Sequence, residues 1–212
     1  MVNGRMPPAE IEKRSFAIIQ AELGGRTFPA DIVPVVYRVI HTTADFDYAD
    51  NLRFSENAVA RAKAALQAGA TVVTDTNMAL SGISKGTLAQ LGGRALCLMA
   101  DTDVAREARA RGVTRATVSM EHAAKLDGPL IFAIGNAPTA LIRLHELIAD
   151  GAVQPALVIG VPVGFVNVVE AKELFIGGDT PYIIARGRKG GSNVAAAIVN
   201  ALLYQLVKRE GF

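Results

Sequence analysis

The fold of this chain is decided by residues 130–148, LIFAIGNAPTALIRLHELI, in which a strand, a turn and a helix follow one another. Residues 130–134 are all apolar, which is typical of a strand buried on both faces. Gly135 and Pro138 mark the turn, and apolar residues then recur at helical spacing over residues 141–148. A strand followed at once by a helix is half of a βαβ unit and predicts an α/β fold.

The same pattern recurs along the chain. Short apolar runs predict four more strands, at residues 71–74, 95–99, 156–159 and 182–185. Strands that are apolar on both faces and joined by helices form a parallel sheet with helices on each side. We therefore predict a single domain over residues 1–212, with a three-layer α/β/α, Rossmann-like parallel sheet of about five strands.

Helical spacing also predicts an N-terminal helical lead-in before the first strand. It consists of residues 11–23, 30–40 and 56–67, with Ser55 as the N-cap of the third segment. Residues 104–111 predict a helix between two strands. The last segment, residues 192–208, is almost wholly apolar over four turns, so it should be buried against the sheet or against another subunit.

The composition argues against several classes of protein. The chain has 212 residues, a formal net charge of +2, one cysteine and three histidines. So small a charge does not indicate a nucleic-acid partner, and so few soft ligands predict no metal site. No apolar run approaches the roughly 20 residues of a membrane span, and residues 1–10 lack a signal-peptide pattern. We therefore expect a cytoplasmic protein without a membrane partner.

Ligands of open parallel sheets bind beyond the carboxyl ends of the strands, and one loop there is rich in cations. Residues 186–192, RGRKGGS, place Arg186, Arg188 and Lys189 among glycines directly before a helix that begins at Ser192. Such donors suit a phosphate or a carboxylate. The alternative is that the glycines only form a tight turn and that the cations are solvated.

Other loops at this edge are ambiguous. Residues 75–84 lack the G-x-G-x-x-G spacing, so neither a nicotinamide nor a flavin is expected, and we predict no cofactor. Asp75, Asn77 and Asn136 follow strands, where such side chains either bind a ligand or cap a helix.

His41 is the candidate acid/base. It ends an amphipathic helical stretch, and Arg38, three residues earlier, shares its helical face. A neighbouring guanidinium favours loss of the imidazole proton. Spacing alone, however, fits a cap or a helix-dipole partner better than a catalytic role. His122 and His145 lie in amphipathic helical stretches and are expected to be surface or packing residues.

Five stretches resemble one known family, in order and over nearly the whole chain. They are RSFAII (14–19), RVIHTTADF (38–46), IGNAPTAL (134–141), GVPVGFV (160–166) and RGRKGGS (186–192). The family is precorrin-8X methylmutase, together with its cobalt-precorrin-8 counterpart. Residues 42–46, TTADF, look closer to the cobalt branch than to the oxygen-dependent one.

The resemblance implies a cofactor-free isomerase of corrin (cobalamin) biosynthesis that moves a methyl group between adjacent carbons of a tetrapyrrole. It implies a homodimer with the active site near the subunit interface and a tightly held product. It also implies that His41 is the catalytic acid/base and that Ser15 and Arg38 contact the substrate. We add as candidate substrate contacts Arg14, Arg115, Asn136, Arg186, Arg188, Lys189 and Ser192.

Two other functions fit the same residues. A tetrapyrrole carrier without chemistry would also need a cationic loop and an apolar interior. A nucleotide-dependent transferase or dehydrogenase can be built on the same sheet, because fold does not determine function.

Overall fold

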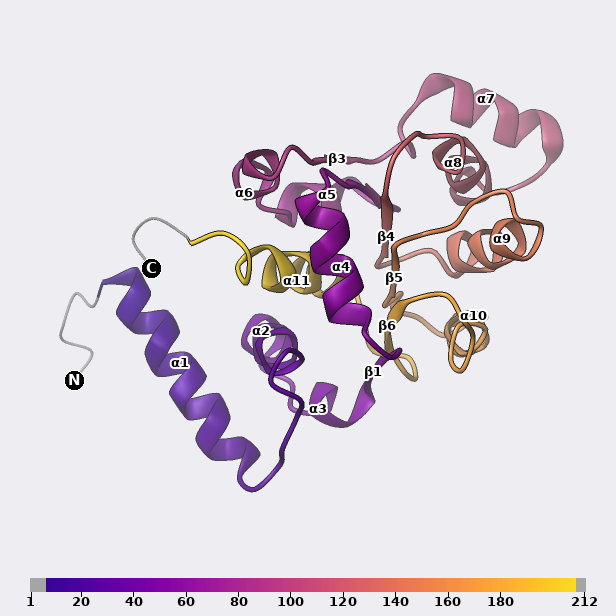
Figure 1. The fold of residues 1–212 in the computed structure, drawn as a ribbon. Helices are drawn as coiled ribbons and strands as arrows, with labels where there is room; N and C mark the ends of the chain where they lie inside the picture. Colours follow the sequence, from indigo (N-terminus) through magenta and orange to yellow (C-terminus); the bar gives the residue numbers. More distant parts are fainter. Residues whose placement is uncertain (1–6, 209–212) are drawn as a thin grey trace.

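A computed structural model describes residues 7–208 of the chain, and residues 1–6, part of the segment used to predict location, lie outside it. One sheet runs through the middle of the molecule (Figure 1). Its strands in chain order are β1 (Leu52–Phe54), β2 (Thr71–Thr74), β3 (Arg94–Leu96), β4 (Leu130–Ile134), β5 (Leu157–Gly160) and β6 (Tyr182–Ala185).

The spatial order of the strands is β1-β6-β5-β4-β2-β3. All neighbours are parallel except β1, which pairs antiparallel with β6. The expected count of about five strands is therefore one too low, because three residues are too few to show a strand period. Numbered along the chain, the parallel strands have the doubly wound order 2-1-3-4-5, which differs from the 3-2-1-4-5-6 order of dinucleotide-binding sheets.

Eleven helices are present in residues 7–208. They are α1 (Pro8–Leu23), α2 (Val33–Thr43), α3 (Tyr48–Asn51), α4 (Ala58–Gln67), α5 (Asn77–Gly82), α6 (Lys85–Gln90), α7 (Thr102–Arg111), α8 (Arg115–Ala123), α9 (Pro138–Ala149), α10 (Val168–Glu173) and α11 (Ser192–Leu203). The prediction of a helical lead-in is confirmed for α1, α2 and α4.

The predicted N-cap at Ser55 is wrong. Helix α4 begins at Ala58, and its N-cap, Asn57, has a left-handed φ of 58° and no side-chain cap bond. The Ser55 hydroxyl oxygen instead accepts a hydrogen bond of 2.9 Å from the backbone N–H of Tyr182. Ser55 therefore joins the end of β1 to β6, a long-range contact that local spacing does not reveal.

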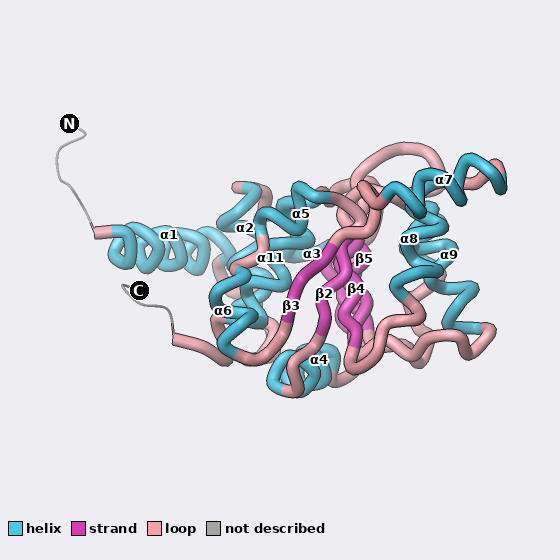
Figure 2. Tube along the Cα trace, turned by 90° about the horizontal axis from the view of Figure 1, so that it is seen from above, coloured by secondary structure: helices cyan, strands magenta, loops and turns pink. Residues whose placement is uncertain are grey.

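Successive side chains along each strand point to opposite faces of the sheet, and each face packs against its own layer of helices. In β4, Ile131 and Ala133 pack with α2, α4 and α11, whereas Leu130, Phe132 and Ile134 pack with α8, α9 and α10. Figure 2 shows the sheet between α2 and α11 on one side and α8 and α9 on the other. The expectation that the last segment is buried is confirmed for α11, which lies between the sheet and α2 and whose side chains are nearly all buried.

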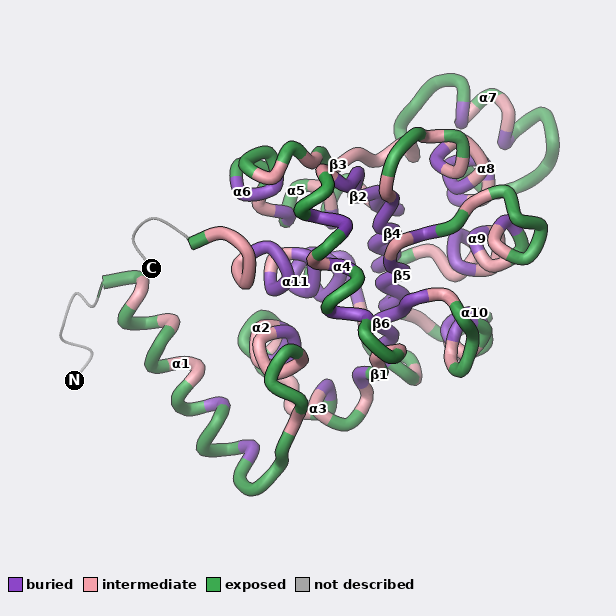
Figure 3. Tube along the Cα trace, viewed as in Figure 1, coloured by how far each residue is buried: buried purple, intermediate pink, exposed green. Residues whose placement is uncertain are grey.

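Helix α1 stands away from the body and packs against α2 (Figure 1). Only Ile19 and Leu23 are buried along its length, and Figure 3 shows most of it as exposed or intermediate. The apolar side chains of Ile11 and Ile18 are each half exposed. Within residues 7–208, no helix is both long enough and apolar enough to span a membrane.

Candidate active site

The crevice at which the strand order reverses lies between β2 and β4. Asp75, which follows β2, bridges it by hydrogen bonds to the loop that follows β4. One carboxylate oxygen of Asp75 accepts from the backbone N–H of Gly135 at 2.9 Å, and the other accepts from Asn136 at 2.8 Å and Ala137 at 2.6 Å. Burial raises the pKa of this carboxyl, and the three N–H bonds act in the opposite direction. The N–H groups ahead of α9 are therefore occupied by a protein carboxylate.

Asp75 is neither a ligand-facing group nor the cap of its own helix, the two roles expected from the sequence. The cap of α5 is Thr76, whose hydroxyl oxygen accepts from the N–H of Ala79 at 3.0 Å. The Thr76 hydroxyl also lies 2.7 Å from the hydroxyl of Ser192, which is buried. Ser192 thus joins the loop after β2 to the start of α11. The side chain of Asn136 is exposed, and its backbone serves Asp75.

Glycines let the loops at this edge approach one another closely. A Cβ atom on Gly190 would lie 2.1 Å from the carbonyl oxygen of Val161, and one on Gly135 would lie 2.7 Å from Cα of Ser192. The N–H of Gly191 donates to that same Val161 oxygen at 2.8 Å. The loops after β4, β5 and β6 therefore form one packed unit.

Replacing Gly190 with alanine is expected to destabilise the protein, because the added methyl group meets backbone that cannot yield without moving a loop. Overpacking of this kind costs about 1–3 kcal/mol or more, so thermal unfolding should begin several degrees lower. Gly86→Ala is the matched control, since nothing lies within 4 Å of a Cβ atom there. A Gly190→Ala protein that melts with the wild type would contradict this packing.

Of the three cations in the loop at residues 186–191, two are paired with protein carboxylates. Arg186 forms two hydrogen bonds with Glu173, of 2.8 and 2.9 Å. Lys189 contacts Asp45 and Asp47, each at 2.6 Å. Arg188 is exposed and pairs with no carboxylate among residues 7–208, and its guanidinium carbon lies 5.4 Å from the ring centroid of Phe165.

Arg186 and Lys189 are therefore each held by protein carboxylates in this structure, and their binding of a ligand anion stays a prediction. The carboxylates of Asp45 and Asp47 hold Lys189, and that of Glu173 holds Arg186. The contacts of Lys189 also place the loop at residues 186–191 beside the connection that follows α2. One of its partners there, Asp45, lies four residues after His41.

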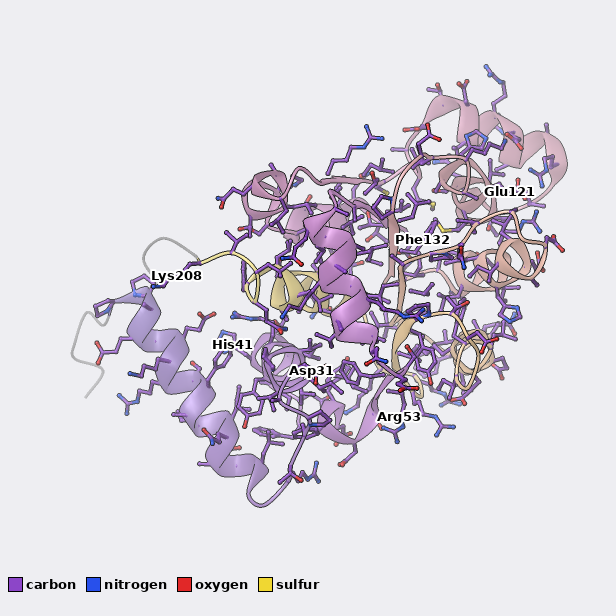
Figure 4. All side chains as sticks on the ribbon, in the orientation of Figure 1. Asp31, His41, Arg53, Glu121, Phe132 and Lys208 are labelled. Carbon is purple, nitrogen blue, oxygen red and sulfur yellow. The ribbon has the colours of Figure 1, made fainter. Side chains whose placement is uncertain are left out.

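His41 lies near the end of α2, and its side chain is exposed. Its ring meets the ring of Phe16 on α1 edge to face, with centroids 5.5 Å apart. Thr42 and Thr43 donate hydrogen bonds back to the carbonyls of residues 38 and 39, each 2.8 Å long, and steady this last turn. Figure 4 shows His41 on the side of α2 that faces α1. The imidazole is thus placed by two helices and is open to a ligand.

Arg38 shares the helical face of His41, as its spacing predicts, because both side chains contact Phe16. Its guanidinium carbon lies 4.9 Å from the Phe16 ring centroid and 5.2 Å from that of Tyr204. It forms an ion pair with Glu12, in which both side chains are about 15% exposed. A ligand carboxylate at this point would therefore have to share Arg38 with Glu12.

Helices α1 and α2, the end of α11 and the residues after it line an open cavity of about 1100 Å³. Arg14, Phe16, Arg38 and Tyr204 are among its lining residues. Arg14 is exposed, whereas the hydroxyl of Ser15 donates to the carbonyl of Ile11 at 2.8 Å. Arg14 and Arg38 thus line one cavity, and His41 is linked to it through the Phe16 ring rather than as a lining residue.

Arg115 is not brought to this cavity. It is the first residue of α8 and is exposed, and α8 belongs to the layer on the other face of the sheet from α2. Within one chain, Arg115 and His41 therefore lie on opposite sides of the sheet.

Sequence reasoning missed Lys172, the most deeply buried cation of the described chain. Its side chain is 0% exposed, and its ammonium donates to the carbonyls of Gly187 and Lys189, each at 2.8 Å. Burial lowers the pKa of this amine to about 8. No signal in the sequence marks it, because residues 168–173 read as an ordinary short amphipathic helix. In residues 7–208, no group of three or more His, Cys, Asp and Glu side chains is placed to hold a metal ion.

Known proteins resemble this chain over most of its length. A sequence model described as precorrin-8X methylmutase matches residues 10–205. The cobalt-precorrin-8 methylmutase of Salmonella typhimurium is 49% identical over 175 residues, which cover 81% of this chain and 80% of the relative. The precorrin-8X methylmutase of Pseudomonas aeruginosa is 44% identical over 195 residues, which cover 91% and 93%.

A solved structure agrees. The crystal structure of a precorrin-8X methylmutase from Thermus thermophilus matches with a TM-score of 0.84 at 43% identity, covering 91% of this chain and 93% of that one. The fold and its relatives thus define an α/β enzyme of the isomerase class that serves cobalamin biosynthesis. The chain belongs to the precorrin-8X methylmutase family.

Proposed function

We propose that this protein moves a methyl group between adjacent carbons of a tetrapyrrole, precorrin-8X or its cobalt form, with His41 as the acid/base. The observation that supports the proposal is the position of the His41 imidazole. It is exposed, its helix ends in a hydrogen-bonded turn, and Phe16 supports its ring. These are the conditions under which a side chain can present a proton to a bound ligand.

In the proposed reaction, the His41 imidazolium protonates the conjugated ring system, the methyl group migrates to the neighbouring carbon, and the proton returns to the imidazole. No atom is gained or lost, and no electron leaves the substrate. Residues of this chain therefore need only bind the substrate, orient it and move one proton.

Arg188 is our first candidate for a substrate carboxylate, because it is the exposed loop cation that no protein carboxylate neutralises in the described residues. Its planar fork suits a carboxylate, and the Phe165 ring supports it. Arg14 and Arg38 are proposed as a second group of contacts, beside Ser15. Arg186 and Lys189 can bind a substrate carboxylate only by releasing the protein carboxylates that hold them now. Asn136 and Ser192 are further candidates for substrate contact.

We also propose that the active form is a homodimer, with each chain acting as one domain. Arg115 and His41 lie in opposite layers, and a second copy that contributes one of them would bring both to one substrate. The exposed Ile11 and Ile18 of α1 supply apolar surface for such a contact. The cytoplasmic location and the tight retention of product stay predictions.

The nucleotide-dependent alternative is disfavoured by Asp75. A pyrophosphate at a doubly wound sheet uses free N–H groups at the crevice where the strand order reverses. Here Asp75 already accepts from three of those N–H groups, and its negative charge would repel a phosphate.

The experiment that tests the proposal also decides between an enzyme and a carrier. The purified protein is incubated with metal-free and with cobalt-loaded precursor while the absorption spectrum is recorded. Migration of the methyl group changes the conjugation, so one or both substrates should give a spectrum that differs from that of the bound precursor. Stoichiometric binding without further change would show a carrier, and the substrate that reacts identifies the pathway branch.

A further inference from the structure

The buried ammonium of Lys172 has no carboxylate partner among residues 7–208. Two glutamates flank it on α10, but Glu173 pairs with Arg186, and no ion pair links Lys172 to Glu170. Its acceptors are the two carbonyls of the loop after β6, beside which α10 lies in Figure 1.

A buried cation without a counter-charge is unfavourable for the fold. Moving an ammonium group out of water costs more than its hydrogen bonds to neutral carbonyls return, and an apolar side chain of similar length would avoid that cost. The lowered pKa of Lys172 is consistent with this cost. Stability of the core therefore does not account for a lysine at this position.

The two carbonyls belong to Gly187 and Lys189, on either side of Arg188. Fixing both peptide groups fixes the backbone from which Arg188 projects toward the Phe165 ring. The same loop is held from outside, where the Lys189 ammonium contacts Asp45 and Asp47. Lys172 is thus the inner support of a loop whose outer face carries the exposed arginine.

We propose that Lys172 is a positioning residue, which holds the loop at residues 186–191 so that Arg188 can bind a carboxylate of the substrate. The proposal rests on the proposed function for the identity of that substrate. The positioning of the loop itself does not depend on it.

The first test needs no substrate. Amide hydrogen exchange is compared between wild type, Lys172→Met and the exposed control Lys85→Met. Lys172→Met should raise exchange in residues 186–192 on the order of tenfold, while the β4 amides keep their protection, because only the loop loses its support. Unchanged exchange in the loop overturns the proposal, whatever the protein binds. Should Lys172→Met not fold, Lys172→Gln carries the same comparison.

The second test uses the tetrapyrrole substrate. Lys172→Met should raise KM on the order of tenfold and leave kcat within about twofold, since carboxylate binding contributes equally to the ground and transition states. In an Arg188→Ala background, Lys172→Met should raise KM no further. Additive effects would overturn the proposal, because Lys172 would then act independently of Arg188. Wild-type protein that neither binds nor converts the substrate refutes the proposed function and leaves the exchange result to decide the role of Lys172.

Discussion

Replacing His41 with alanine is expected to lower the rate constant of the methyl shift by about 10²–10⁴-fold, which corresponds to ~3–5 kcal/mol of transition-state stabilisation. Binding of the tetrapyrrole should change little, because the grip on its carboxylates comes from other residues. The side chain is exposed, so the variant should fold and melt like the wild type. Single-turnover absorption measurements, together with a binding titration, give both quantities.

His122→Ala is the matched control for that experiment. His122 lies on α8, where its ring nitrogen is 2.8 Å from the Glu107 carboxylate, in the layer opposite α2. Its loss should leave turnover unchanged. If His41→Ala turns over at the wild-type rate, the imidazole has no part in the reaction.

Asp75→Ala is expected to cause the largest loss of stability. The change leaves three N–H groups without acceptors at a site that is only 1% exposed. Each unsatisfied buried donor costs about 1–3 kcal/mol, so a total of roughly 3 kcal/mol or more is a large share of the stability of a domain. Urea unfolding should show a midpoint far below that of the wild type.

Asp101→Ala controls for the loss of a carboxylate at the same edge of the sheet. Asp101 is exposed and makes no side-chain cap bond to α7. Its removal should shift the midpoint only slightly. Equal unfolding midpoints for the two variants would mean that Asp75 does not hold the loop before α9.

The sheet was largely predictable because its central strands are short and largely apolar runs. The strands at residues 71–74, 130–134 and 182–185 were predicted with the bounds that the structure shows. The edge strand β1 was missed, since Arg53 interrupts its three residues and the strand exists only through its pairing with β6. The order in which strands pair is a tertiary property that spacing along the chain does not contain.

The candidate site was predictable only where it is local. Arg38 and His41 share a face because both lie on one helix, and the common contact with Phe16 confirms it. Charge pairing across the chain could not be predicted. Lys189 and Asp45 are 144 residues apart, yet their ion pair is one reason why the cationic loop is less free than its composition indicates.

The burial of Asp75 and Lys172 was equally invisible. Both are ionisable residues, and such residues are normally exposed. Their roles appear only when the loops after β2, β4 and β6 are seen to pack against one another.

The most direct test of the central claim is a crystal structure of the protein with the methyl-shifted tetrapyrrole bound. We expect an imidazole nitrogen of His41 within about 3 Å of the macrocycle, or one water molecule away, with Arg188 against a peripheral carboxylate. A macrocycle bound far from α2, with His41 facing only solvent, would contradict the account.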